Sequence, residues 1–115
     1  MAKRRCISID VYESERFLDL SDRAKVLYTQ LILRGDDEGV VINPRTAMRL
    51  CGACEDSLQE LTDAQLLLLV GEIMVVKHWY VHNKIPPSKR TESVYKNELS
   101  RLCINERNEY EFTGD

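Results

Sequence analysis

Two short apolar runs separated by a two-residue turn constrain the fold more than any other feature of this sequence. The first run, LLLLV at 66–70, is separated by Gly71 and Glu72 from the second, IMVV at 73–76. A glycine at the first position of such a turn favours a tight antiparallel β-hairpin. The first run is also the longest unbroken apolar run in the chain, so no segment is predicted to span a membrane.

Three helices are predicted before this hairpin. Apolar residues spaced three and four apart predict the first over 21–34, with Ser21 as its N-cap. An Asn-Pro pair is typical of a helix start and predicts the second over 44–51. Gly52 ends this helix, and a third begins near Glu55. Two short helices joined by a few residues that include glycine are typical of a helix-turn-helix.

The order of these elements predicts a winged helix-turn-helix domain. A β-branched run at 40–42 predicts a short strand between the first two helices, which completes a three-stranded sheet with the hairpin. The expected fold class is therefore α+β, mainly α, with a small antiparallel sheet whose wing hairpin covers about 66–76, and with a C-terminal helix. This domain is expected to cover residues 1–85.

The two ends of the chain are predicted from weaker patterns. Alternation of apolar and polar residues at 6–11 favours a short strand, and 13–18 favours one or two helical turns. Two prolines make 86–91 an extended connector rather than a regular helix. A C-terminal helix is expected over 92–103, followed by an acidic, frayed tail over 104–115.

Five segments of the sequence resemble one family. They are MAKRRCISID at the start, RFLDLS, LILRGDDEGVVINP, MRLCGACEDSLQEL and VVKHWYVHNKI, and together they cover about residues 1–85. These segments resemble the N-terminal domain of phage replisome organisers, the DnaD-like replication initiators of phages and prophages of Gram-positive bacteria. The resemblance implies a winged-helix domain that binds double-stranded DNA at the phage origin and supports assembly of the host replication machinery, including helicase-loading proteins. It also implies a place in the cytoplasm of a bacterial host.

The formal net charge of the chain is −3, but the charges are distributed unevenly along the sequence. Residues 77–101 contain six Lys or Arg against two Asp or Glu, whereas residues 36–70 contain two against seven. A local basic region can face a polyanion even when the whole chain is acidic, although a basic stretch is often only a solvated face.

The predicted DNA contacts are mainly basic. A flexible N-terminal arm is suited to phosphates or a minor groove, and the first helix of a helix-turn-helix commonly crosses the DNA backbone. The candidate nucleic-acid-binding residues are Lys3, Arg4, Arg5, Arg45, Arg49, Ser57, Gln59, Lys77, His78, Lys84, Lys89 and Arg90. Such phosphate contacts would give affinity with little sequence reading.

The predicted recognition helix is unusually acidic. In EDSLQELTD at 55–63, the polar residues suited to base edges are outnumbered by four acids. The alternative hypothesis is therefore a protein–protein adaptor or oligomerisation module of the same fold that uses this helix, and a third is a transcriptional regulator. For the DNA-binding hypothesis a homodimer is expected, because initiators often meet repeated or palindromic sites.

The remaining reactive side chains favour structural roles. Cys51 and Cys54 form a CxxC pair, which is compatible with a redox pair, with half of a zinc site or with simple packing, and packing is favoured because no second pair accompanies it. His78 and His82 lie four apart in an aromatic setting and are interpreted as structural histidines. We find no catalytic motif, so neither enzymatic activity nor a cofactor is predicted.

Overall fold

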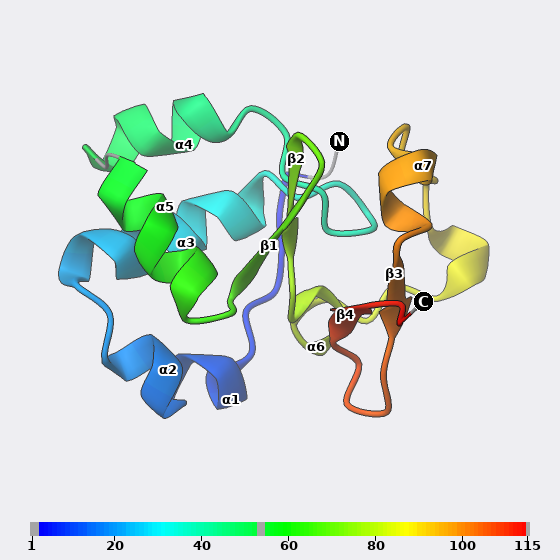
Figure 1. Cartoon of the computed structure of the whole chain (residues 1–115), viewed down its shortest axis with the longest axis horizontal. Coiled ribbons are helices and arrows are strands. Elements are labelled where there is room, and N and C mark those ends of the chain that lie inside the picture. Colours follow the sequence, from blue (N-terminus) through cyan, green and yellow to red (C-terminus); the bar gives the residue numbers. More distant parts are fainter. Residues whose placement is uncertain (1–2, 53–54, 115) are drawn as a thin grey trace.

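The computed structural model describes residues 3–52 and 55–114 as an α+β fold with two small antiparallel sheets (Figure 1). This confirms the predicted fold class at the level of α+β. The elements are, in chain order, α1 (Ile9–Tyr12), α2 (Glu15–Leu18), α3 (Asp22–Leu33), α4 (Pro44–Cys51), α5 (Glu55–Asp63), β1 (Leu67–Val70), β2 (Ile73–Val76), α6 (Trp79–His82), the 3-10 turn η1 (Pro87–Lys89), α7 (Lys96–Leu99), β3 (Leu102–Ile104) and β4 (Tyr110–Phe112).

Helices α3, α4 and α5 gather beside the β1–β2 hairpin (Figure 1). Ser21 caps α3, because its side-chain oxygen accepts the backbone N–H of Ala24 at 3.2 Å. The apolar face of α3 is fully buried, as is Leu61 of α5. The three predicted helices and the predicted hairpin are therefore confirmed, with bounds within two residues of those expected.

The segment before α4 extends the β1–β2 sheet. The backbone N–H of Val41 donates to Met74 at 2.9 Å, and that of Val76 donates to Gly39 at 2.9 Å. Val40 lies opposite Val75 in an isolated bridge. The strand expected at 40–42 is thus present as bridging residues that pair with β2, but it is too short to form a regular strand.

The turn before this segment closes over Trp79. The indole N–H of this fully buried side chain donates to the carbonyl oxygen of Asp37 at 3.0 Å. A Cβ atom at Gly39 would lie 2.7 Å from the Trp79 side chain, and Gly39 has a φ of 89°. Only glycine meets both conditions without strain, so the DDEG turn and the tryptophan fit each other closely.

The strand predicted at 6–11 is wrong. Residues from Ile9 onward form α1, whose N-cap Ser8 accepts the backbone N–H of Asp10 at 3.2 Å. The residues before it are held instead by side chains of α6 and its C-cap, since Asn83 accepts the backbone N–H of Cys6 at 2.8 Å. The alternation of apolar and polar residues at 6–11 gave a wrong prediction because it runs across two structures, the extended N-terminal segment and the start of α1.

The C-terminal predictions are also wrong in part. Instead of a helix over 92–103, only α7 is helical, and β3 then pairs antiparallel with β4. The tail expected to be frayed over 104–115 forms this hairpin up to Phe112, and Tyr110 within it is buried. The connector at 86–91 is not fully extended, because it contains η1.

No helix in the described part of the chain is long and apolar enough to cross a membrane.

Candidate nucleic-acid interface

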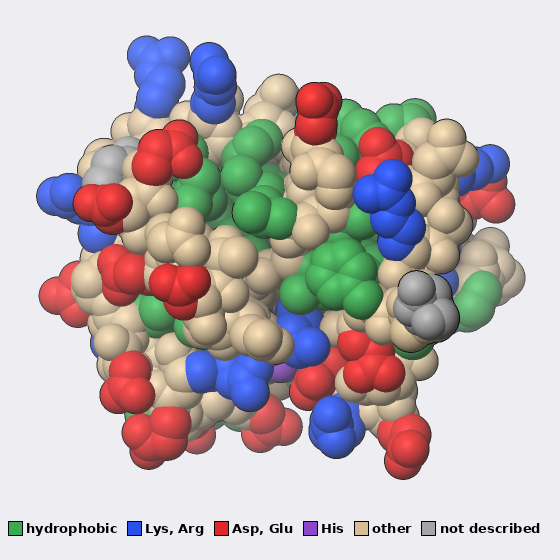
Figure 2. Space-filling model, viewed as in Figure 1, with side chains coloured by type: hydrophobic (Ala, Val, Ile, Leu, Met, Phe, Trp, Pro, Cys, Tyr) green, Lys and Arg blue, Asp and Glu red, His purple; other side chains and the backbone are tan. Residues whose placement is uncertain are grey.

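Helix α4 presents two arginines to solvent. Arg45 and Arg49 are both exposed and lie four residues apart, so they share one face of the helix, while Ala47 is fully buried on the opposite side. None of the ion pairs formed within residues 3–52 and 55–114 includes either arginine. Figure 2 shows basic side chains projecting from the molecule over α4. Two uncompensated cations on one helix face are suited to phosphate groups.

Helix α5 is acidic on its outer face. Glu55, Asp56 and Asp63 are exposed, and acidic side chains cover this part of the surface in Figure 2. Ser57, predicted to contact DNA, is buried with 3% of its surface exposed, so that prediction is wrong. Gln59 is exposed, but its side-chain amide donates to Asp63 at 2.8 Å. The helix expected to read bases therefore offers DNA mostly negative charge.

Glu60, one of the acidic residues of α5, has a structural role. The carboxylate of Glu60 accepts the backbone N–H of Ser21 at 2.9 Å and the Ser21 hydroxyl at 2.8 Å. The backbone hydrogen bond is the main cause that lowers the pKa of Glu60. This contact joins α5 to the N-terminus of α3, and so explains one acid without reference to a partner.

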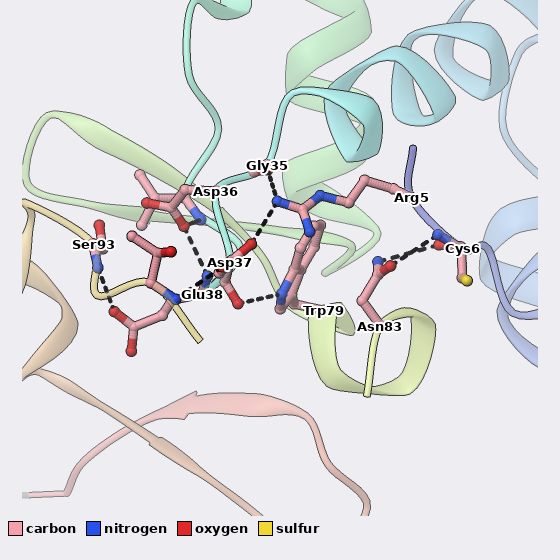
Figure 3. A network of polar contacts seen from close by, with 11 residues as sticks. Arg5, Cys6, Gly35, Asp36, Asp37, Glu38, Trp79, Asn83 and Ser93 are labelled. Atoms are coloured by element: carbon pink, nitrogen blue, oxygen red, sulfur yellow. Dashed lines mark hydrogen bonds and ion pairs between the residues drawn. The ribbon is translucent and has the colours of Figure 1, made fainter. Parts of the chain in front are cut away.

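The N-terminal arm is fixed at Arg5, contrary to the flexible arm expected. The guanidinium donates to the Gly35 carbonyl at 2.9 Å and to the Asp37 carboxylate at 3.0 Å, and it lies 5.0 Å from the centre of the Trp79 ring (Figure 3). With its side chain only 5% exposed, Arg5 is not available to DNA. Lys3 and Arg4, which precede it, are exposed.

These contacts place the start of the arm beside the segment that leads into α4. Gly35, which accepts from Arg5, forms a β-bridge with Val41, and α4 begins at Pro44. Lys3 and Arg4, which precede this point of attachment in the chain, are exposed. The sequence alone did not show where Arg5 is attached.

The basic residues that directly follow the hairpin are engaged within the molecule. The ammonium group of Lys77 donates to the Tyr110 carbonyl at 3.1 Å. His78 is 7% exposed, and its Nε2 lies 3.5 Å from a carboxylate oxygen of Glu109. Burial is the main cause that lowers the pKa of His78, which favours the neutral form of this ring. The predicted DNA contact by His78 is wrong, because its ring is inside the molecule.

The predicted connector and the residues just before it carry three of the candidate cations. Lys84 and Lys89 are exposed, whereas Arg90 is half-buried. The guanidinium of Arg90 lies 4.5 Å from the centre of the Tyr80 ring and donates to the Ile85 carbonyl at 2.9 Å. Arg90 is thus held in place, whereas Lys84 and Lys89 are exposed to solvent.

His82 has the structural role that was predicted. Its Nδ1 accepts the backbone N–H of Ser8 at 2.8 Å, and its Nε2 lies 2.8 Å from the Tyr28 hydroxyl. Because Nδ1 accepts a hydrogen bond, the neutral ring carries its proton on Nε2 and donates to Tyr28. Burial lowers the pKa of His82 to about 4.

Cys51 is half-buried, and its thiol donates to the Ala47 carbonyl at 3.1 Å. This contact agrees with the packing interpretation of that cysteine. Cys54, the second residue of the CxxC pair, lies outside the described residues.

Sequence reasoning missed a hollow formed by the connector and the β3–β4 hairpin. It has a volume of about 380 Å³, and its lining includes Ile104 and Asn108 in addition to Lys84 and Arg90. A signal was present in the sequence, because two short runs rich in apolar residues, LCI and YEF, lie on either side of a polar turn. That pattern favours a hairpin where a helix was expected.

Comparison of the chain with protein-family models, with curated proteins and with solved structures finds no match.

Proposed function

We propose that this chain is a DNA-binding winged-helix domain of the phage replication-initiator type, which holds double-stranded DNA by phosphate contacts from α4 and the N-terminal arm. The residues assigned to this surface are Lys3, Arg4, Arg45 and Arg49. The observation that carries the proposal is the pair of exposed arginines on one face of α4, which have no acidic partner among the described residues.

The order and pairing of the elements support the winged-helix interpretation. Helix α3 is followed by the bridging segment at 39–41, then by α4 and α5, and then by the β1–β2 hairpin, which pairs with that segment through β2. This is the arrangement in which the hairpin acts as the wing. In helix-turn-helix proteins the first helix of the pair crosses the DNA backbone, which is the role proposed here for α4.

The charge of α5 sets the kind of binding that we propose. An acidic helix in a major groove would meet phosphates on both sides with like charge, so base reading by this helix is disfavoured. Contacts from Lys and Arg to phosphates carry affinity without sequence information. We therefore propose a backbone-binding domain with little specificity of its own.

The wider role is proposed from the resemblance to replisome organisers. In that role the domain binds phage origin DNA in the bacterial cytoplasm, as a homo-oligomer, and supports assembly of host helicase-loading proteins. Repeated binding sites would then supply the specificity that one weakly reading domain lacks. A transcriptional regulator would use the same surface, so mutants of α4 do not separate these two roles.

A second candidate function is a protein adaptor that uses α5. The exposed acids Glu55, Asp56 and Asp63 favour it, together with Leu50, which is 63% exposed near the C-terminal end of α4. An apolar residue next to acidic ones fits a basic, partly apolar protein surface.

Fluorescence anisotropy with a labelled random-sequence duplex at low salt separates the two candidates. The double variant Arg45→Ala and Arg49→Ala should weaken binding about ten-fold or more, because two phosphate contacts are removed. A control with the same change in net charge is Lys96→Ala and Arg107→Ala, two exposed residues outside the proposed surface, and it should bind nearly as the wild type does. No binding by the wild type, or equal losses for both variants, would reject the proposed surface.

A further inference from the structure

The hollow between the connector and the β3–β4 hairpin is positively charged and has apolar walls. Seven residues line it: Tyr80, Lys84, Ile85, Pro86, Arg90, Ile104 and Asn108. Two of these are cations and none is an acid. Neither cation takes part in an ion pair within residues 3–52 and 55–114. An uncompensated pair of cations at the edge of a concave site attracts an anion.

The two cations differ in how they can act. Arg90 is held against Tyr80 and by its bond to Ile85, so little side-chain freedom is lost when a ligand meets it. Lys84 is exposed and can adjust its long side chain to the ligand. A fixed guanidinium with a movable ammonium is a suitable pair for a phosphate group, which accepts several hydrogen bonds.

The other walls indicate what the anion is attached to. Ile85, Pro86 and Ile104 are apolar, and Ile104 is 46% exposed although it is a large aliphatic residue. Asn108 adds a carboxamide that can both donate to and accept from the edge of a planar polar ring. The volume of about 380 Å³ lies at the small end of small-molecule sites, and the hollow is open to solvent.

We infer that this hollow binds a single nucleotide unit, with its phosphate at Lys84 and Arg90 and its base against Ile85, Pro86 and Ile104. The unit is either a free mononucleotide or one nucleotide of a single strand, since both offer a phosphate joined to a planar base. The site shares no residue with the DNA surface proposed on α4 and does not depend on it.

An NMR titration of the full chain tests this inference. Thymidine monophosphate, an eight-nucleotide oligo-dT, inorganic phosphate and an acidic, phenylalanine-containing hexapeptide are added separately while backbone and Asn108 side-chain amide signals are followed. We expect saturable shifts around Ile104 and Asn108 with the mononucleotide, the oligonucleotide or both. A site for free nucleotide gives similar affinities for the two, whereas a site for a strand favours the oligonucleotide.

Variants of the lining make the test specific. Lys84→Ala should weaken nucleotide binding about five-fold, the effect of losing one exposed charge contact. Lys89→Ala is the matched control, because Lys89 is also exposed on the connector but does not line the hollow, and it should leave the affinity unchanged. Ile104→Asn should weaken the nucleotide but not inorganic phosphate, because only the base is expected to meet that residue.

Three results would overturn the inference. They are the absence of saturable shifts with both nucleotide probes, equal losses for the two lysine variants, and binding of the acidic peptide as tight as that of the nucleotide. The last result would assign the hollow to a protein segment instead. Because these variants leave Arg45 and Arg49 intact, failure here is separate from failure of the proposed duplex surface.

Discussion

Two regions of this molecule are held together by different forces. The central unit, residues 9–82, contains nearly all of the buried apolar side chains, whereas the two wrapping segments, 3–8 and 83–112, contribute only Leu102 and Tyr110 to that set. The wrapping segments are attached largely by polar contacts, many of which meet at the DDEG turn before Val40. Burial of apolar surface tolerates small errors of placement, while hydrogen bonds require particular partners, so the two regions should respond differently to mutation and pH.

The turn at 36–39 receives contacts from both wrapping segments. Arg5 donates to the carboxylate of Asp37, and the backbone N–H of Thr91 donates to its other oxygen at 2.9 Å. The backbone N–H of Ser93 donates to the Glu38 carboxylate at 2.8 Å, and the Tyr110 hydroxyl donates to the Glu38 carbonyl at 2.7 Å. The N-terminal arm and the C-terminal hairpin are therefore both anchored to one turn of the central unit.

The largest effect is expected from a cavity in the central unit. Leu61 of α5 is fully buried, so Leu61→Ala should lower the free energy of unfolding by about 2–5 kcal/mol in urea denaturation. Leu69→Ala is the control, because Leu69 is 54% exposed on β1, and it should cost much less. Equal losses for the two variants would contradict the assignment of the core to the central unit.

Acid should weaken the attachment of the N-terminal segment. The pKa of His82 is about 4 in the folded protein and near 6.5 when unfolded, so the unfolded chain binds the proton first as the pH falls. The stability that depends on neutral His82 is fully present above pH 6.5 and is lost towards pH 4, by roughly 3 kcal/mol.

The matched variant for this effect is His82→Asn, whose side-chain oxygen can still accept from Ser8 but does not titrate. Its free energy of unfolding should fall less steeply between pH 6.5 and pH 4 than that of the wild type. Some slope remains in the variant, because burial also lowers the pKa of His78. An unchanged slope would show that His82 is not the group responsible.

Alanine variants of Arg4 and Arg5 distinguish a role in DNA binding from a role in attaching the N-terminal segment. Arg5→Ala removes a charged hydrogen bond to Asp37 and a contact with Trp79, and it should lower the free energy of unfolding by about 2 kcal/mol. Arg4→Ala changes an exposed side chain and should leave stability within about 0.5 kcal/mol of the wild type while weakening duplex binding. Thermal denaturation and anisotropy of both variants check this, and the reverse pattern would reject the assigned roles.

Among the variants expected to destabilise the protein, the smallest effect is expected at the C-terminal hairpin. Tyr110→Phe removes only the hydroxyl that donates to the Glu38 carbonyl, so it should cost about 1 kcal/mol in urea denaturation. Tyr95→Phe, at a half-buried tyrosine outside this contact, is the comparison. A loss at residue 95 as large as that at residue 110 would argue against the anchoring role of this hydroxyl.

The central unit was largely predictable because its signals are local and strong. The N-cap Ser21, the Asn-Pro pair at 43–44 and the Gly71 turn each act on neighbouring backbone, and the apolar spacing of α3 has one helical period. The wrapping segments were predicted poorly because their contacts join residues far apart in sequence. Nothing near Arg5 indicates that its partners are Gly35 and Asp37, so a basic arm was expected where a fixed guanidinium is found.

The exposure of the candidate site residues was predictable on the helix surface of α4 but not elsewhere. Exposed helix positions follow from period, so Arg45 and Arg49 were found, whereas the burial of Ser57 and His78 depends on tertiary packing. The C-terminal hairpin was missed because Tyr95, Leu99 and Leu102 also fit a helical spacing. The turn at 105–108, in which Asn105 accepts two backbone N–H groups, separates two short runs rich in apolar residues and was the signal for a hairpin.

The salt dependence of duplex binding tests the central claim most directly. If Arg45 and Arg49 each neutralise a phosphate, the logarithm of the binding constant falls linearly with the logarithm of salt concentration for the wild type. The slope for the double alanine variant should then be smaller in magnitude by about 1.8. Binding that is insensitive to salt, or identical slopes for the two proteins, would contradict the account.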